Sequence, residues 1–305
     1  MTDPFNEKSL DDDSPLNLSK LSGLPVVGPM LGKFFKGGPK IPVIRLSGVI
    51  ADASMKRGGL SYARLSKLID KAFSIPKAPV VVLVINSPGG APAQSQLIAG
   101  LIREKAEAKA ITVTAFVEDV AASGGYWLAC AADDIYVQET SIVGSIGVIS
   151  AGFGFEDFMD KHGVKRRLYT SGRDKSMLDP FLPEKPGDVS RLKEIQIQMH
   201  AHFIDWVKDR RGGRLNGTDD ELFQGRFWTG SAALDMGLVD GVGGVHATMR
   251  EKYGEDVRFI EMSPDKKMPF PLSLIPTGRA ALGHGLADDI LSTVEDRAVW
   301  SRFGL

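Results

Sequence analysis

One stretch decides the fold of this chain: Val120-Ala121-Ala122-Ser123-Gly124-Gly125-Tyr126-Trp127. It follows a strand-like apolar run, Ile111–Val117, and leads into the small apolar segment Leu128–Ala132. A strand that breaks at small residues and continues as a helix leaves the turn residue exposed at the helix N-terminus. The glycines after it allow another backbone to come within hydrogen-bonding distance. Ser123 is therefore either a candidate nucleophile or simply the N-cap of a helix, a position that serine favours.

Strand and helix patterns alternate on both sides of this stretch. Val80–Ile85 is an unbroken apolar run of strand length, which is typical of a strand buried on both faces. Such alternation predicts an α/β fold with a mostly parallel sheet and right-handed crossovers. In these sheets ligands bind at the carboxyl ends of the strands. The glycine turn 86–90 and the Ser123 turn both follow strands, so we expect them to lie close together.

The remaining elements follow from periodicity and from helix-stop signals. We expect further strands at Pro42–Val49, Ile135–Val137, Ile142–Ile149 and Arg166–Tyr169, and helices at Tyr62–Phe73, Ala93–Glu107, Phe155–His162, Val189–Arg211 and Val245–Tyr253.

Composition narrows the class of protein. The 305 residues are 43% hydrophobic and 25% charged, as in an ordinary soluble protein, and the formal net charge of −1 gives no reason to propose a nucleic-acid partner. The single cysteine, Cys130, lies among alanines and is interpreted as a buried structural thiol. No run of 18 apolar residues and no secretory signal pattern is present, so we expect a cytoplasmic protein.

Three regions are predicted. Residues 1–40 form an N-terminal extension, residues 41–262 the main domain, and residues 263–305 a tail with a candidate helix. The stretch Leu16–Lys36 mixes apolar residues with glycine, proline and lysine. It could be a flexible arm, or it could lie on a membrane surface or dock on a partner.

A nucleophilic serine needs a base and a group that stabilises the oxyanion. None of the five histidines, 162, 200, 202, 246 and 284, lies in a glycine-marked loop, although a serine–histidine pair stays an alternative. Lys175 is the other candidate, because an apolar stretch beside it (177–181) could desolvate it and lower its pKa. Gly89 and Gly90 follow a proline and could offer free backbone amides, or they could merely make a tight connection.

Four motifs occur in an order that resembles the signal peptide peptidase A (protease IV) family of serine–lysine peptidases, whose fold is of the ClpP/crotonase type. The resemblance covers about residues 41–250. Its motifs are Asn86-Ser87-Pro88-Gly89-Gly90, Ala121-Ala122-Ser123-Gly124-Gly125-Tyr126, Val143-Gly144-Ser145-Ile146-Gly147-Val148 with Ser171-Gly172 to Lys175 after it, and Gly225-Arg226-Phe227-Trp228-Thr229-Gly230 with Gly237-Leu238-Val239-Asp240.

The resemblance implies a role for each site residue. Ser123 would be the nucleophile and Lys175 the general base. Gly90 would supply the oxyanion amide, with Gly89 shaping the turn, and Ser145 would orient the lysine amine. The reaction needs no cofactor and no metal ion. Family members build each site from neighbouring subunits or tandem domains, so a chain with one motif set is expected to form a ring-shaped homo-oligomer.

The resemblance therefore implies a serine endopeptidase that hydrolyses small or extended apolar peptides, such as signal-peptide remnants, through an acyl-enzyme. The usual bacterial members carry a membrane anchor at the N-terminus, and this sequence departs from them there. Two alternatives share the fold: a crotonase-type acyl-CoA enzyme and a catalytically inactive scaffold.

Overall fold

The computed structural model describes residues 37–52, 59–262, 298 and 300–304. The chain divides after Gly38 into two units, and the elements below belong to the second unit. In chain order they are β1 (Lys40–Ser47), α2 (Tyr62–Phe73), β2 (Val80–Ser87), α3 (Pro92–Lys109), β3 (Thr112–Ala122), α4 (Gly124–Ala129), β4 (Asp134–Val137), β5 (Ile142–Gly144), α5 (Glu156–Lys161), α6 (Pro186–Arg211), α7 (Asp219–Leu222), β6 (Phe227–Thr229), α8 (Gly230–Asp235), β7 (Gly241–Val242), α9 (Val245–Tyr253) and β8 (Arg258–Met262).

Within the described residues, eight strands form one sheet with the main order β6-β5-β3-β2-β1-β8, and β4 and β7 continue it from β3. Every pairing is parallel except that of β5 with β6. The prediction of a mostly parallel α/β sheet with helical extensions is confirmed.

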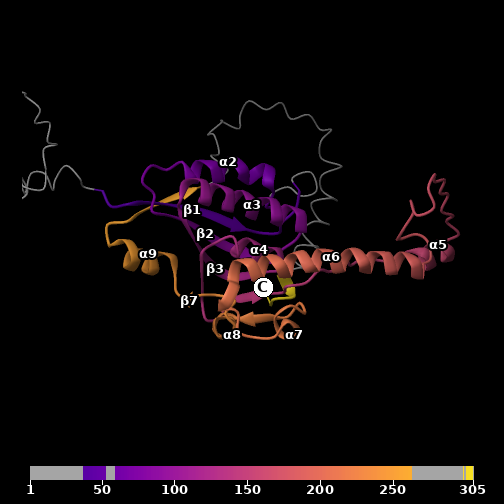
Figure 1. The fold of residues 1–305 in the computed structure, drawn as a ribbon. Coiled ribbons are helices and arrows are strands. Elements are labelled where there is room, and N and C mark those ends of the chain that lie inside the picture. The colour runs from indigo at the N-terminus through magenta and orange to yellow at the C-terminus, as the bar shows by residue number, and fades with distance from the viewer. Residues whose placement is uncertain (1–36, 53–58, 263–297, 299, 305) are drawn as a thin grey trace, which may run out of the picture. The chain divides into compact units, whose positions relative to one another are not determined.

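Strand β2 is buried on both faces, as its unbroken apolar run predicts. Val81, Leu83 and Ile85 belong to the large core under α2, α3 and α4, and Figure 1 shows these helices beside β1 and β2. The alternate residues, such as Val82, face the other side, where they pack with Met249 of α9. Burial on both sides fits the place of β2 between β1 and β3, and a site can form at its carboxyl end, where ligands bind in such sheets.

Two predicted strands differ from the structure. The run expected at Ile142–Ile149 ends at Gly144, because Ser145 has a positive φ of 52° and turns the chain. The strand expected at Arg166–Tyr169 is wrong, since these exposed residues have no strand beside them in the part of the chain that the structure describes. Without a neighbouring strand, the backbone N–H and C=O groups of this segment have no inter-strand hydrogen bonds to stabilise an extended conformation.

Helix α6 ends at Arg211, before Gly212-Gly213, as its stop signal predicts. Its other end runs past the sheet toward α5 (Figure 1). None of the helices in the described ranges is long and apolar enough to cross a membrane. The predicted N-terminal extension, its membrane contact and most of the predicted tail fall on residues outside the described ranges, and they stay predictions.

A buried arginine joins α6 to the loop after α8. The Arg211 side chain is 1% exposed, and it donates to Asp240 at 2.7 and 3.0 Å and to the Gly237 carbonyl at 2.9 and 3.1 Å. Burial alone would raise the pKa of Asp240, but the Arg211 hydrogen bonds and charge outweigh it and lower that pKa. The carboxylate also accepts from the Ile135 N–H at 2.8 Å, so it ties the loop to β4.

We predict that Arg211→Leu lowers the free energy of unfolding by about 3 kcal/mol, because it removes one partner of a buried ion pair. Denaturant unfolding measures the change. Arg191→Leu, on the exposed face of the same helix, is the control and should change stability by less than about 0.5 kcal/mol. Equal effects of the two substitutions would contradict the structural role of Arg211.

Candidate active site

Ser123 lies at a sharp turn between β3, which ends at Ala122, and α4, which begins at Gly124. Its backbone has φ 52° and ψ −122°, a conformation that costs a residue with a side chain about 1–3 kcal/mol. The Ser123 N–H donates to the Gly144 carbonyl at 2.8 Å, and the side chain is partly exposed. Its side chain caps no helix amide, so the simple N-cap interpretation is not supported.

The glycine turn after β2 lies directly against Ser123. A Cβ atom added to Gly89 would come within 2.8 Å of the Ser123 Cβ, and one added to Gly125 would come within 2.4 Å of the Ser87 carbonyl oxygen. Gly89 also has φ 102°, which favours glycine. The predicted proximity of the two strand-end turns is confirmed.

Gly90 is held in place by Ile50, which lies after β1 and is not part of any of the four motifs. Ile50 donates its N–H to the Gly89 carbonyl and accepts from the Ala91 N–H, both at 2.8 Å. These two hydrogen bonds form a parallel β-bridge between Ile50 and Gly90. They use the Gly89 carbonyl and the Ala91 N–H, so the N–H of Gly90 itself faces away from Ile50. A Cβ at Gly90 would lie 2.0 Å from the Ile50 oxygen, so only glycine fits.

Ser145 lies next to Ser123, because β5 pairs with β3 up to Ala122 and Gly144. Its φ is also 52°, and its N–H donates to the Arg226 carbonyl at 2.6 Å. Trp228 of β6 packs against Gly144, where an added Cβ would come within 2.7 Å of the indole ring. The motif around Trp228 thus has a structural role, which is to support the turn that carries Ser145.

Lys175 lies apart from Ser123. It belongs to the lysine segment (residues 150–185), whose Leu178 N–H is bonded to Asp188 near the start of α6 at 3.2 Å. Helix α6 first bonds to the serine turns at His200, about 18 Å further along its axis. Figure 1 shows α5, which is part of the lysine segment, at the end of α6 remote from α4. The Lys175 side chain is exposed, so the expected desolvation by its neighbours does not occur within one chain.

Helix α6 makes contacts that sequence reasoning did not find. His200 bonds to the Ile146 carbonyl, and Trp206 donates to the Trp127 carbonyl, each at 3.1 Å. Arg210 donates to the Cys130 carbonyl at 2.9 Å. In the sequence these residues are only the polar and aromatic part of an amphipathic helix, and nothing there indicates which backbone groups they meet.

None of the histidines in the described ranges forms a pair with Ser123. In the described part of the chain no hydrogen bond joins a histidine to Ser123, and His284 lies outside the described residues. Burial raises the pKa of the Cys130 thiol to about 12, which fits the predicted structural thiol. Among the described residues no group of three or more histidine, cysteine or acidic side chains could hold a metal ion.

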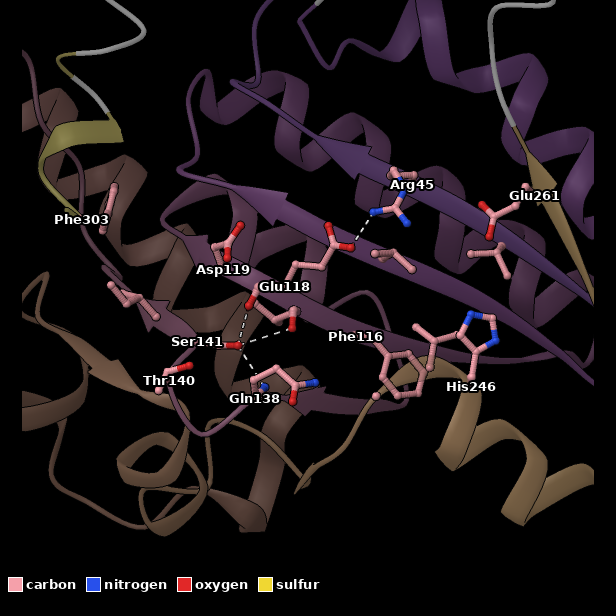
Figure 2. A pocket seen from close by; sticks show the side chains of 16 residues that line it. Arg45, Phe116, Glu118, Asp119, Gln138, Thr140, Ser141, His246, Glu261 and Phe303 are labelled. Carbon is pink, nitrogen blue, oxygen red and sulfur yellow. Dashed lines mark hydrogen bonds and ion pairs between the residues drawn. The ribbon is translucent and has the colours of Figure 1, made fainter. Parts of the chain in front are cut away.

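A cavity of about 600 Å³ lies on the sheet face that α9 partly covers, and none of the predicted site residues lines it. Figure 2 shows Arg45 paired with Glu118 across its floor, at 2.6 Å, and Ser141 bonded to the backbone beside it. The hydrogen bond that Arg45 donates to the Glu118 carboxylate raises the pKa of Arg45. The charged pair on its floor and Ser141 thus already have hydrogen-bond partners within the chain.

Comparison with known proteins identifies the family. The model of peptidase family S49 matches residues 105–256. A protein of Enterococcus faecium named as a signal peptide peptidase SppA is 30% identical over 85% of this chain and 76% of its own length. The chloroplastic serine protease SPPA of Arabidopsis thaliana is 31% identical, over 84% of this chain and 40% of its own.

A Na⁺/H⁺ antiporter NhaA of Brucella abortus is 45% identical over 87% of this chain, which spans only 37% of that protein's length. The Enterococcus relative, by contrast, is covered over 76% of its length, and the range matched by the family model spans the positions of Ser123, Ser145 and Lys175. The chain therefore belongs to peptidase family S49, a family of serine peptidases with the ClpP/crotonase-type fold.

Proposed function

We propose that this protein is a serine endopeptidase with a Ser123–Lys175 dyad. One observation carries the proposal. Ser123 projects from a strained strand-to-helix turn, partly exposed, with the Gly89-Gly90 backbone against it. Such a turn holds a hydroxyl where a substrate can reach it, and a structural serine would not need that strain.

In the proposed reaction the Ser123 Oγ attacks the carbonyl carbon of the scissile peptide bond while the Lys175 amine takes the hydroxyl proton. The substrate oxygen becomes negative, and the Gly90 N–H donates to it. When the C–N bond breaks, Lys175 returns the proton to the leaving amine and an acyl-enzyme remains. Lys175 then takes a proton from a water molecule, which attacks the ester carbonyl. As the C–O bond to Ser123 breaks, Lys175 returns that proton to the Ser123 Oγ, and the peptide acid is released.

The lysine would come from a neighbouring copy of the chain. In one chain Lys175 is exposed and far along α6 from Ser123, and burial is what makes a lysine a base near neutral pH. The lysine segment also exposes large apolar side chains, with Phe153 at 82% and Tyr169 at 91% exposure. Contiguous exposed apolar groups mark interaction surfaces. Docking of this segment on a second subunit would cover them and bury Lys175 beside Ser123 and Ser145.

The substrate would be a small or extended apolar peptide. Gly90 is exposed and has no side chain, so a substrate backbone can lie along it as an added strand. The name of the Enterococcus relative supports signal-peptide remnants as the substrate class.

We predict that Ser123→Ala abolishes peptide hydrolysis and labelling by a fluorophosphonate probe, while the fold and the oligomeric mass stay unchanged. Only one hydroxyl on an exposed turn is lost. Ser190→Ala, at an exposed position of α6, is the control and should be labelled like the wild type. A wild-type protein that takes no probe would favour a crotonase-type acyl-CoA enzyme or an inactive scaffold.

Lys175→Ala should lower kcat by about 10²–10⁴-fold, the usual contribution of a general base. Lys175→Arg should not restore it, because a guanidinium keeps its proton near neutral pH. The rate should rise with pH as the lysine loses its proton. The measurement is the pH dependence of kcat/KM for the wild type and for the Lys175→Ala variant. A profile set by a group near about 6.5, the ordinary histidine value, would point to a serine–histidine pair instead.

A mixture of the two inactive variants, Ser123→Ala and Lys175→Ala, should regain activity after subunit exchange. With equal amounts, about a quarter of the interfaces would pair an intact serine with an intact lysine, because each comes from a different subunit. Hydrolysis by the mixture, with exchange verified by mass, measures this. If exchange occurs and no activity returns, the dyad lies within one chain.

A further inference from the structure

Helix α6 touches both serine-bearing turns. The His200 imidazole is bonded to the Ile146 carbonyl at 3.1 Å, and the Trp206 indole N–H donates to the Trp127 carbonyl at 3.1 Å. Ile146 directly follows Ser145, and Trp127 lies in the first turn of the helix after Ser123. One helix thus contacts a backbone carbonyl close to each of the two serines, and each contact uses a side-chain donor.

The His200 contact fixes the Ser145 turn. A carbonyl oxygen can only accept, so the His200 Nε2 carries the proton and donates it. The same oxygen accepts from the Gly225 N–H at 3.1 Å, which occupies both of its lone pairs. Ile146 itself is fully buried, so its carbonyl has little freedom to move once both donors are in place.

The Trp206 contact fixes the Ser123 turn. The Trp127 N–H donates to the Ser123 carbonyl at 3.0 Å, so a shift of Trp127 would move the serine backbone. The Trp127 and Trp206 rings stack with their centroids 6.2 Å apart, and the Phe203 ring of α6 also stacks on Trp127, with a centroid distance of 4.8 Å. Arg210, one turn further along α6, holds the Cys130 carbonyl at the end of α4.

We propose that His200 and Trp206 are positioning residues, which set the distance between the Ser123 and Ser145 hydroxyls through α6. This inference rests on the proposed serine–lysine function. The two residues are six apart on one rigid helix, about 9 Å along its axis, so their contacts hold the two turns at a fixed separation. A lysine amine from a neighbour must meet both hydroxyls at once, and a misplacement of about 1 Å can lower a rate about 10²-fold.

Loss of either contact should therefore act on the chemical step more than on substrate binding. The substrate would meet the same Gly90 edge, which Ile50 holds independently of α6. The alignment of the hydroxyls with the lysine amine would be lost. A defect of this kind lowers kcat and leaves KM nearly unchanged.

The test uses the full-length oligomer and four variants. His200→Leu removes one donor, and His200→Gln offers an amide N–H in its place. Trp206→Phe keeps an aromatic ring against Trp127 and removes only the indole donor. His202→Leu is the matched control, because His202 is exposed on the same helix two residues away. Each variant is assayed for kcat and KM on an apolar peptide, for the rate of fluorophosphonate labelling, for oligomeric mass and for thermal unfolding.

We expect His200→Leu and Trp206→Phe to lower kcat at least about tenfold with KM within about twofold, since only alignment is lost. His200→Gln should recover most of the rate, His202→Leu should match the wild type, and the oligomeric mass should not change. A wild-type kcat in both His200→Leu and Trp206→Phe would overturn the inference. A loss of kcat that is explained by unfolding of the variant or by dissociation of its oligomer would also overturn it. An inactive, unlabelled wild type would instead overturn the proposed function and this inference with it.

Discussion

The hydrogen bond from the Ser123 N–H to the Gly144 carbonyl, 2.8 Å long, is the constraint on which the site depends. It completes the last pair of the β3–β5 ladder, Ala122 with Gly144. The next residue of each strand, Ser123 or Ser145, then turns the chain away with φ 52°. Two serines thereby follow neighbouring strand ends at the carboxyl edge of the sheet. The glycines nearby follow from crowding, because a Cβ at Gly89 or at Gly144 would clash with Ser123 or Trp228.

The same constraint explains what a single chain lacks. The sheet and α4 place Ser123, Ser145 and the Gly90 backbone within one small region. The amine that would activate the nucleophile lies beyond the far end of α6, in a segment with exposed apolar side chains. We infer that assembly completes the site, because within one chain Lys175 is exposed and lies far along α6 from Ser123.

Much of this arrangement could be predicted from the sequence. The predicted bounds of the helices Tyr62–Phe73 and Val245–Tyr253 agree with the structure, and in the first the apolar residues recur at helical spacing. The proximity of the Ser123 and Gly90 turns followed from the rule that parallel strands end at one edge. The strand at Arg166–Tyr169 was wrong, because apolar residues indicate strand propensity but not the presence of a partner. Ile50, His200 and Trp206 could not be found, since each acts on a backbone group far away in sequence.

The most direct test is an experimental structure of the intact oligomer with a phosphonate inhibitor bound. The account predicts a covalent bond from the inhibitor to the Ser123 Oγ. It also predicts the Lys175 Nζ of a neighbouring subunit within about 3 Å of the Ser123 and Ser145 hydroxyls, the range of a hydrogen bond. A bound inhibitor with no lysine within reach, or with Lys175 of the same chain folded back to Ser123, would contradict it.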